Sequence, residues 1–222
     1  GMLGNAVLRQ FSSQKGFQVV GTVRSAGSIA LLPSDLREQI MIGVDVEQFD
    51  SLTGAMAQVR PGVVINCIGV VKQLAQADDP LTALPINSIL PHRIAALCKL
   101  GGARLVHIST DCVFSGRKGM YNEMDFPDAD DLYGRSKLLG EVDYPHAITL
   151  RTSIIGHELQ GKRSLLNWFL AQEGHTRGFT RAVFSGLPTV ELARVIAEFV
   201  LPRSKLHGLY HVSAAPINKF DL

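Results

Sequence analysis

The sequence lacks the marks of several protein classes. No apolar run reaches the ~20 residues that a membrane-spanning helix needs. The N-terminus has no basic-then-apolar secretory signal, so a cytoplasmic protein without a membrane partner is expected. Three cysteines without CxxC spacing indicate neither a disulfide framework nor a zinc site. The seven histidines show no HExxH or paired spacing, so no metal ion is expected. The 22 Lys and Arg residues are scattered and nearly balance 20 Asp and Glu, which gives no indication of a nucleic-acid partner.

What is present is the pattern of an α/β protein with a substantial core. Of the 222 residues, 46% are apolar, and short β-branched runs alternate with helical spacings. Consecutive apolar positions such as Val63-Val64-Ile65 are typical of parallel strands covered on both faces. The sequence therefore predicts a doubly wound, Rossmann-like parallel sheet. We expect its strands over Phe17–Val23, Gln39–Val44, Val63–Asn66, Arg104–Ser109 and Ala147–Thr152.

Helical spacing predicts the remaining organisation. A helix is expected over Leu3–Lys15 with Gly16 as its C-cap, and Gly101-Gly102 is expected to end another around Arg93–Leu100. After about Arg151 the alternation loosens, with a helix around Trp168, an irregular stretch over 174–186 and a helix over 190–200. We expect a cofactor-binding domain over residues 1–150 and, over 151–222, a mixed region that holds part of a smaller substrate-binding unit.

Tyr133 and Lys137 form a YxxxK element that predicts proton transfer. Residues four apart lie on one helix face, so the phenol and the ammonium can converge. A nearby cation stabilises phenolate and lowers the tyrosine pKa from about 10, which makes the phenol a better acid near neutrality. By itself this spacing is common, and an exposed Tyr–Lys pair is the alternative.

A second signal is the polar end of the strand that precedes this helix. Ser109, Thr110 and Asp111 follow an apolar run, and ligands of open α/β sheets bind beyond the carboxyl ends of strands. The alternative is that the hydroxyls satisfy backbone groups in a turn and that Asp111 caps it. Because a YxxxK helix follows some twenty residues later, we favour a catalytic role.

The N-terminus resembles part of a dinucleotide loop. Gly1-Met2-Leu3-Gly4, followed by a helix, is similar to the last two glycines of a GxxGxxG loop, where backbone amides approach a pyrophosphate. Gly1 as a remnant of a cleaved tag is the alternative. The strand expected before such a loop is not in the sequence. In a 3-2-1-4-5-6 sheet that strand is central, so we expect the second and fourth strands to have unpaired edges, with a distorted sheet or a strand lent by a neighbouring chain.

Residues after the next strands indicate the kind of cofactor. Arg24 and Ser25 stand where an acidic residue would bind the ribose of NAD and an arginine accommodates the 2′-phosphate of NADP, so NADP(H) is expected in preference to NAD(H). Asp45 and Val46 would border the adenine, and residues 66–69 would pass beneath the cofactor. Turn chemistry is the alternative for the last two segments, and a solvated strand end for Arg24.

Seven segments occur in one order and spacing: Gly1–Gly4, Asn66–Gly69, Asn87, Ser109–Phe114, Tyr121–Glu123, Tyr133–Glu141 and Leu150–Thr152. Together they resemble the dTDP-4-dehydrorhamnose reductase family of extended short-chain dehydrogenases, over almost the whole chain. The resemblance implies that hydride passes from NADPH to a keto carbon of a nucleotide-linked deoxysugar. Tyr133 would protonate the oxygen, Thr110 would hydrogen-bond it, and Lys137 would hold the nicotinamide ribose. The implied cofactor contacts are Gly1, Met2, Leu3, Gly4, Arg24, Ser25, Asp45, Val46, Asn66, Cys67, Ile68, Asn87, Ser109, Tyr133 and Lys137.

Substrate contacts and the exact reaction stay open. Lys72, Gln73, Asp111 and Arg181 are candidates for touching sugar or diphosphate, with solvent-facing or capping roles as the alternative. Three carboxylates over 127–131 are unfavourable neighbours for an anionic substrate unless they form a solvated turn. The chain ends where relatives continue for several tens of residues that help to build the sugar site. An epimerase or epimerase-reductase, a non-catalytic NADP-binding module like the regulatory subunit of methionine adenosyltransferase, and a chain that binds no cofactor are alternatives. A homodimer is compatible with each.

Overall fold

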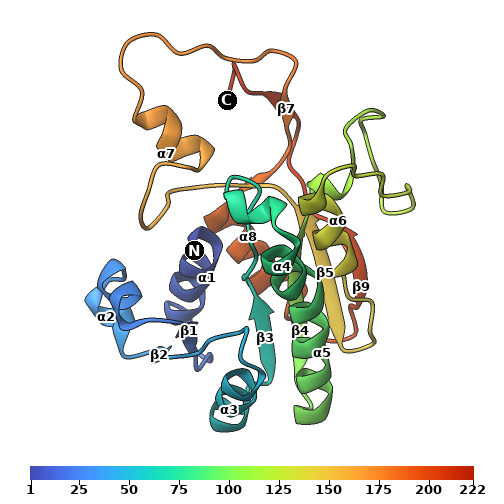
Figure 1. The fold of residues 1–222 in the computed structure, drawn as a ribbon. Coiled ribbons are helices and arrows are strands. Elements are labelled where there is room, and N and C mark those ends of the chain that lie inside the picture. Colours follow the sequence, from blue (N-terminus) through green and yellow to red (C-terminus); the bar gives the residue numbers. More distant parts are fainter.

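A four-stranded parallel sheet forms the centre of the molecule (Figure 1). In spatial order it contains β3 (Val63–Asn66), β4 (Arg104–Thr110), β5 (Ala147–Thr152) and β9 (Gly208–His211). The computed structural model describes residues 1–222. All six residues of β5 are buried, because helices cover both faces of the sheet. The doubly wound α/β prediction is confirmed, and β3 and β5 have the predicted bounds.

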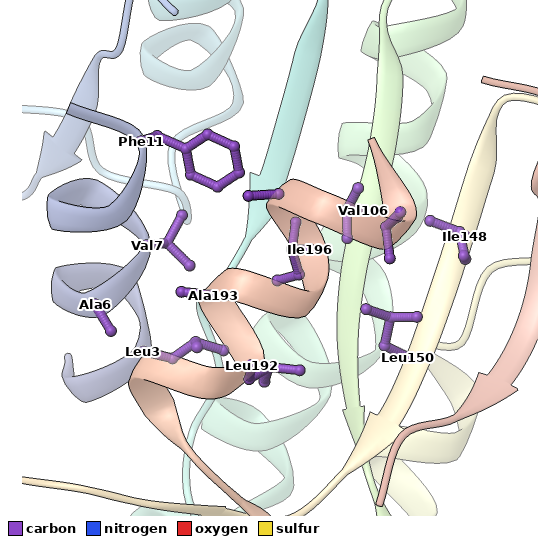
Figure 2. Packing of buried hydrophobic residues seen from close by; sticks show 12 residues of the cluster. Leu3, Ala6, Val7, Phe11, Val106, Ile148, Leu150, Leu192, Ala193 and Ile196 are labelled. Atoms are coloured by element: carbon purple, nitrogen blue, oxygen red, sulfur yellow. The ribbon is translucent and has the colours of Figure 1, made fainter. Parts of the chain in front are cut away.

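Two apolar clusters hold the helices on the sheet. On one face α8 (Thr189–Val195) packs on β4 and β5 and α1 (Met2–Ser12) packs against α8, and Figure 2 shows Leu3 and Ile196 in this cluster with Val106 and Leu150. On the other face α3 (Phe49–Val59) and α5 (Leu90–Gly101) pack over Leu105 and Ala147. Thus α8 and β9, from the segment after residue 150, belong to the central unit.

The strands β1 (Gly21–Val23) and β2 (Ile40–Ile42) form a separate two-stranded parallel sheet beside α1 (Figure 1). No hydrogen-bonded ladder joins β1 to β3. The expected unpaired edges of the second and fourth strands are therefore found, and the distortion takes the form of a sheet divided in two.

Several predicted bounds were wrong. Residues 17–20, 39, 43 and 44 are not in strands, because β1 and β2 pair only with each other and only over three residues. The first helix ends at Ser12 with Ser13 as its C-cap, so Gly16, at φ +95°, makes the later turn instead of the cap. Gly102, at φ +68°, caps α5 in the left-handed conformation, so the predicted break at Gly101-Gly102 falls after Gly101, the last residue of the helix.

The remaining elements are short. No helix of the structure has the length and apolarity that crossing a bilayer requires. The other helices and turns are α2 (Ser34–Arg37), α4 (Pro80–Ala83), α6 (Leu132–Leu139), α7 (Leu165–Leu170), 3₁₀ turns over Ala26–Leu31, Ala75–Asp78 and Asp111–Val113, and π-helical turns over Leu84–Ile89 and Ile196–Val200. Two small ladders pair β6 (Ile154–Ile155) with β8 (Leu187–Pro188) and β7 (Val183–Phe184) with β10 (Ile217–Asn218).

Candidate active site

Thr110 stands at the carboxyl end of β4, where the strand turns into the 3₁₀ turn over Asp111–Val113. Its hydroxyl oxygen accepts a hydrogen bond from the Cys112 backbone amide at 3.1 Å, which caps that turn. The same hydroxyl donates to the Asp111 carboxylate at 3.2 Å. The residue that caps this turn is therefore Thr110 and not Asp111, and the capping hydrogen bond fixes the Thr110 hydroxyl at the sheet edge where ligands of α/β proteins bind.

Two glycines seat α6 directly on neighbouring backbone. Asp131 caps the helix by accepting a hydrogen bond from the Gly134 amide at 2.7 Å. A Cβ at Gly134 would lie 2.3 Å from the Cys112 carbonyl oxygen, and one at Gly140 would lie 1.9 Å from that of Asn87. Only glycine allows this approach at either end of α6. The helix therefore brings Tyr133 and Lys137 against the end of β4.

Tyr133 is a protonated phenol at neutral pH. Burial raises its pKa well above the usual value of 10, and the neighbouring Cys112 and Asp111 act in the same direction, while the Thr110 hydroxyl acts against them. We expected Lys137 to lower this pKa, and that direction was wrong because desolvation of the phenolate dominates. Tyr133 can therefore donate a proton, and it holds that proton firmly.

Lys137 is almost fully buried and points to the same strand end. Its ammonium donates a hydrogen bond to the backbone carbonyl oxygen of Ile108 at 2.8 Å. Ile108 lies on β4, two residues before Thr110. Burial lowers the Lys137 pKa to about 8, and the negative charge of Glu141 partly offsets this. Near neutrality the side chain is still mostly a cation, so it can attract the hydroxyl groups of a ribose.

Candidate cofactor residues gather at the N-terminus of α1 and the end of β1. Gly1 is the N-cap of α1 and no side chain caps the helix there, while a Cβ at Gly4 would lie 3.7 Å from the Cys67 side chain. The Arg24 side chain is 75% exposed and lies 4.0 Å from Glu47, too weak a pairing to hold it. Asp45 caps the following turn by accepting from the Glu47 amide at 3.1 Å.

Asn66 and Asn87 shape the loop between them instead of facing solvent. The side-chain nitrogen of Asn66 lies 3.1 Å from His107 Nδ1, and the side-chain oxygen of Asn66 accepts a hydrogen bond from the Ile68 backbone amide at 3.0 Å. Asn87, 1% exposed, accepts from the Val70 amide at 2.9 Å and donates to the Val70 carbonyl and the Ser136 hydroxyl. The predicted cofactor contact at Asn87 is thus occupied by the protein's own groups, and Asn87 ties the loop to α6.

One large cleft unites most candidate residues. Its volume is about 2310 Å³, well above the roughly 300–1,000 Å³ of ordinary ligand sites, because it includes the space between β1 and β3. It is lined by Gly1, Met2, Leu3, Gly4, Arg24, Asp45, Val46, Asn66, Cys67, Ile68, Lys72, Gln73, Ser109, Thr110, Asp111, Tyr133 and Lys137. Ser25 and Asn87 lie outside its lining, and Arg181 lines a separate small pocket.

The acidic segment before α6 forms specific contacts. Asp131 pairs with Lys72 at 2.5 Å, Asp130 with Arg117 at 3.1 Å, and Asp128 accepts from the Ser115 amide and hydroxyl. These partners neutralise or cap the carboxylates, so they do not form a bare acidic patch. Lys72, a predicted substrate contact, is bound to the cap of α6 instead.

Glu141 and Arg151 are functional candidates that the sequence analysis quoted without giving them a role. They form a buried ion pair behind Ser109, with Arg151 Nη2 and Glu141 Oε2 2.7 Å apart. A single arginine in an otherwise uncharged, fully buried strand requires a buried acidic partner. That rule predicts an acidic partner for Arg151, although it does not identify which Asp or Glu that partner is.

Comparisons with known proteins agree with this arrangement. The model of the RmlD substrate-binding domain family matches residues 1–222. A methionine adenosyltransferase 2 subunit beta of Danio rerio is 29% identical over 96% of this chain and 66% of its own length. A dTDP-4-dehydrorhamnose reductase of Mycobacterium tuberculosis is 33% identical over 51% of this chain and 41% of its own length.

A solved structure described as a hypothetical dTDP-4-dehydrorhamnose reductase from Sulfolobus tokodaii superimposes with a TM-score of 0.81 at 27% identity, over 99% of this chain and 76% of that one. The chain spans from about two fifths to two thirds of the length of the first curated relatives it matches. With the family model matching from end to end, the chain belongs to the RmlD substrate-binding domain family of extended short-chain dehydrogenases.

Proposed function

We propose that this chain is the greater part of an NADPH-dependent reductase that acts on a 4-keto nucleotide-linked deoxysugar. The observation that carries the proposal is the single cleft that holds Thr110, Tyr133 and Lys137 together with the N-terminus of α1 and Arg24. A proton donor, a hydroxyl for the reacting oxygen and a cation for a ribose stand at one end of β4. A phosphate-binding helix end lines the same space.

The residues fit a nicotinamide dinucleotide. The open amides of α1 would hold its pyrophosphate, Arg24 would pair with a 2′-phosphate, and Lys137 would hold the ribose next to the nicotinamide. The bound dinucleotide supplies a hydride to the keto carbon of the sugar. Tyr133 donates its proton to the oxygen that becomes a hydroxyl, and Thr110 orients that oxygen by a hydrogen bond. Preference for NADPH over NADH is assigned to Arg24.

The reaction requires the phenolate of Tyr133 to form in a site that disfavours it. Burial and the nearby Asp111 both oppose the loss of the proton, while the Thr110 hydroxyl favours it. A ribose bound between Tyr133 and Lys137 would link the cation to the phenol through its hydroxyl groups. We infer that the ternary complex, and not the protein alone, makes Tyr133 an effective acid.

Fluorescence titration with NADPH tests the proposal. Quenching of Trp168 or enhancement of dinucleotide emission should saturate in the micromolar range, with NADH binding about tenfold more weakly. Oxidation of NADPH that depends on added dTDP-4-dehydrorhamnose would establish the reductase. Binding without turnover of this sugar, but with turnover of a UDP-linked sugar, would favour the epimerase or epimerase-reductase alternative.

A non-catalytic module is the second candidate, and a specific observation favours it. The relative that aligns with 96% of the chain is named a subunit of methionine adenosyltransferase. The intact Thr110, Tyr133 and Lys137 set argues for the enzyme. Saturable NADPH binding with no turnover of either sugar would decide for the module, and no binding at millimolar NADPH would contradict both candidates.

A further inference from the structure

The ion pair of Arg151 and Glu141 lies in one row of side chains across three strands. Ser109 on β4 is in register with Arg151 on β5, which is in register with His211 on β9. In-register residues of neighbouring strands project to the same face. Glu141, just after α6, accepts hydrogen bonds from Ser109 at 2.7 Å and from Arg151 at 2.8 and 2.7 Å.

Every side of the Arg151 guanidinium is used. Two nitrogens bind Glu141, the third lies 3.4 Å from His211 Nε2, and the flat face is 5.1 Å from the centre of the Phe114 ring. Burying both charges costs several kcal/mol of desolvation per ion, so such a pair is weak evidence for stability. Its geometry, with a planar fork on one side and a ring on the other, is one that lysine cannot reproduce.

Phe114, Tyr121 and Lys118 stack on one another and form a column that begins at the Arg151 guanidinium. The Phe114 ring stacks on Tyr121 with centroids 4.3 Å apart and planes 14° apart, and the Lys118 ammonium lies 5.9 Å from the outer face of Tyr121. The column thus runs from buried Glu141 to the surface. Both outer members belong to the segment 115–128, which contains no helix or strand.

The segment 115–128 leaves the site after Thr110 and returns to it before Tyr133. Ser115 and Asp128 close its base with hydrogen bonds of 2.8 and 2.6 Å, and Glu123 accepts from the His211 amide at 2.8 Å. It exposes Met120 and Met124, which are 91% and 92% accessible. Without regular structure, its position depends on these few anchors.

We propose that Arg151 is a positioning residue that holds the segment 115–128 in place through the aromatic column, and that this segment, which joins Thr110 to Tyr133, thereby keeps the sugar side of the site in order. Glu141 in turn holds Arg151, so one buried pair orients both the strand end at Ser109 and the segment that follows Thr110. The substrate part of this inference rests on the proposed function, whereas the anchoring part does not.

Limited trypsin digestion tests the anchoring, because Arg117 and Lys118 are cleavage sites within the segment. Arg151→Lys should speed cleavage there at least tenfold, with an unchanged far-UV circular dichroism spectrum. Phe114→Leu leaves the ion pair intact and should speed cleavage several-fold, so the inference stays testable if the arginine variant fails to fold.

Arg104→Lys is the matched control. Arg104 binds the Val200 and Leu206 carbonyls at the opposite end of β4, so its loss disturbs the same sheet without touching the column. Its cleavage rate at residues 117 and 118 should equal that of the wild type. Equal acceleration in the control, or none in Arg151→Lys and Phe114→Leu, would overturn the anchoring.

Kinetics test the substrate part. In Arg151→Lys the KM for dTDP-4-dehydrorhamnose should rise at least fivefold while the Kd for NADPH stays within twofold of the wild type. A fall in kcat with unchanged KM would overturn the part of the inference that concerns the sugar. If the chain turns out not to reduce this sugar, the proteolysis result still stands or falls by itself, so the two failures can be told apart.

Discussion

The two sheets of the molecule differ in how firmly they hold the residues they carry. Thr110 and Arg151 stand on strands that are paired on both sides, and β5 is buried at every position. Arg24 follows a strand of three residues that is paired on one side and has no buried position. Thr110, which would bind the reacting oxygen, thus stands on a strand paired on both sides, whereas the residue that would choose the cofactor follows a short strand with one ladder partner and no buried position. The difference predicts that mutations in the two regions will have effects of unlike size and kind.

The largest expected effect is that of Tyr133→Phe on turnover. Removing the phenolic proton should lower kcat for dTDP-4-dehydrorhamnose by ~10²–10⁴-fold, since this is the usual contribution of a positioned acid. The thermal unfolding midpoint should stay within a few degrees, because the ring that packs is retained. Retained activity in this variant would contradict the assignment of the proton donor.

Core truncations sharpen the comparison between the two sheets. Leu192→Ala removes a fully buried side chain from the cluster over β4 and β5 and should cost about 2–5 kcal/mol of unfolding free energy. Leu36→Ala lies in the three-residue cluster beside β2 and should cost about 2 kcal/mol or less, because the smaller cluster can collapse. Urea denaturation measures both. Equal losses would show that the two-stranded sheet is as firmly held as the central one.

Replacing the buried cation should stabilise the fold. The Lys137 pKa is about 8 in the folded protein against 10.5 normally, so at pH 7 the folded state carries a charge it disfavours. Lys137→Met should therefore raise the unfolding free energy at pH 7 by about 1–3 kcal/mol while it abolishes turnover.

The pH dependence gives the sign of this effect. Between about pH 8 and 10.5 the unfolded wild type binds more protons at Lys137 than the folded one, so the wild type gains stability relative to Lys137→Met over that interval. Chemical denaturation at several pH values measures the difference between the two proteins. A constant difference from pH 7 to 10.5 would mean that burial of Lys137 costs nothing.

Substitutions near the end of β1 should have the smallest effects on binding. Arg24→Gln should raise the Kd for NADPH about tenfold, or about 1.4 kcal/mol, and leave that for NADH nearly unchanged, because only the former carries a 2′-phosphate. Glu47→Gln, which removes the weak partner of Arg24, should change either constant by less than about 1 kcal/mol. A parallel loss of NADPH and NADH affinity in Arg24→Gln would contradict the role of Arg24 in cofactor choice.

Local patterns predicted three of the four strands of the central sheet. Those of β3 and β5 have the predicted bounds, because Val63–Ile65 and most of Ala147–Thr152 are apolar or β-branched. The fourth strand, β9, was not predicted, because Gly208–His211 is not an apolar run. Residues 17–20 have a similar composition but are not in a strand. A ladder needs a partner edge, and the presence of that edge is a tertiary fact that no local window contains.

The sequence predicted which residues form the candidate site better than it predicted their pKa values and hydrogen bonds. The YxxxK spacing and the polar strand end identified Tyr133, Lys137 and Thr110, which share the cleft. The direction of the Tyr133 pKa was missed because burial outweighs the neighbouring cation, and burial depends on the whole packing. Asn87 is a predicted cofactor contact, and the partners of its side chain, Val70 and Ser136, come from segments 17 and 49 residues away that no local pattern connects.

The absence of a Cβ at Gly134 and Gly140 has a consequence for mutational scanning. A library selected for folding alone should already lose nearly every substitution at these two positions, since any side chain would collide with backbone at 2.3 and 1.9 Å. Depletion there cannot be interpreted as evidence for chemistry, although Gly134 lies between Tyr133 and Lys137 and Gly140 follows them closely. Tyr133 should show the reverse: tolerance in a screen for abundance and intolerance in a screen for activity. Comparing the substitutions tolerated in the two screens along α6 would separate the residues that folding requires from those that the reaction requires.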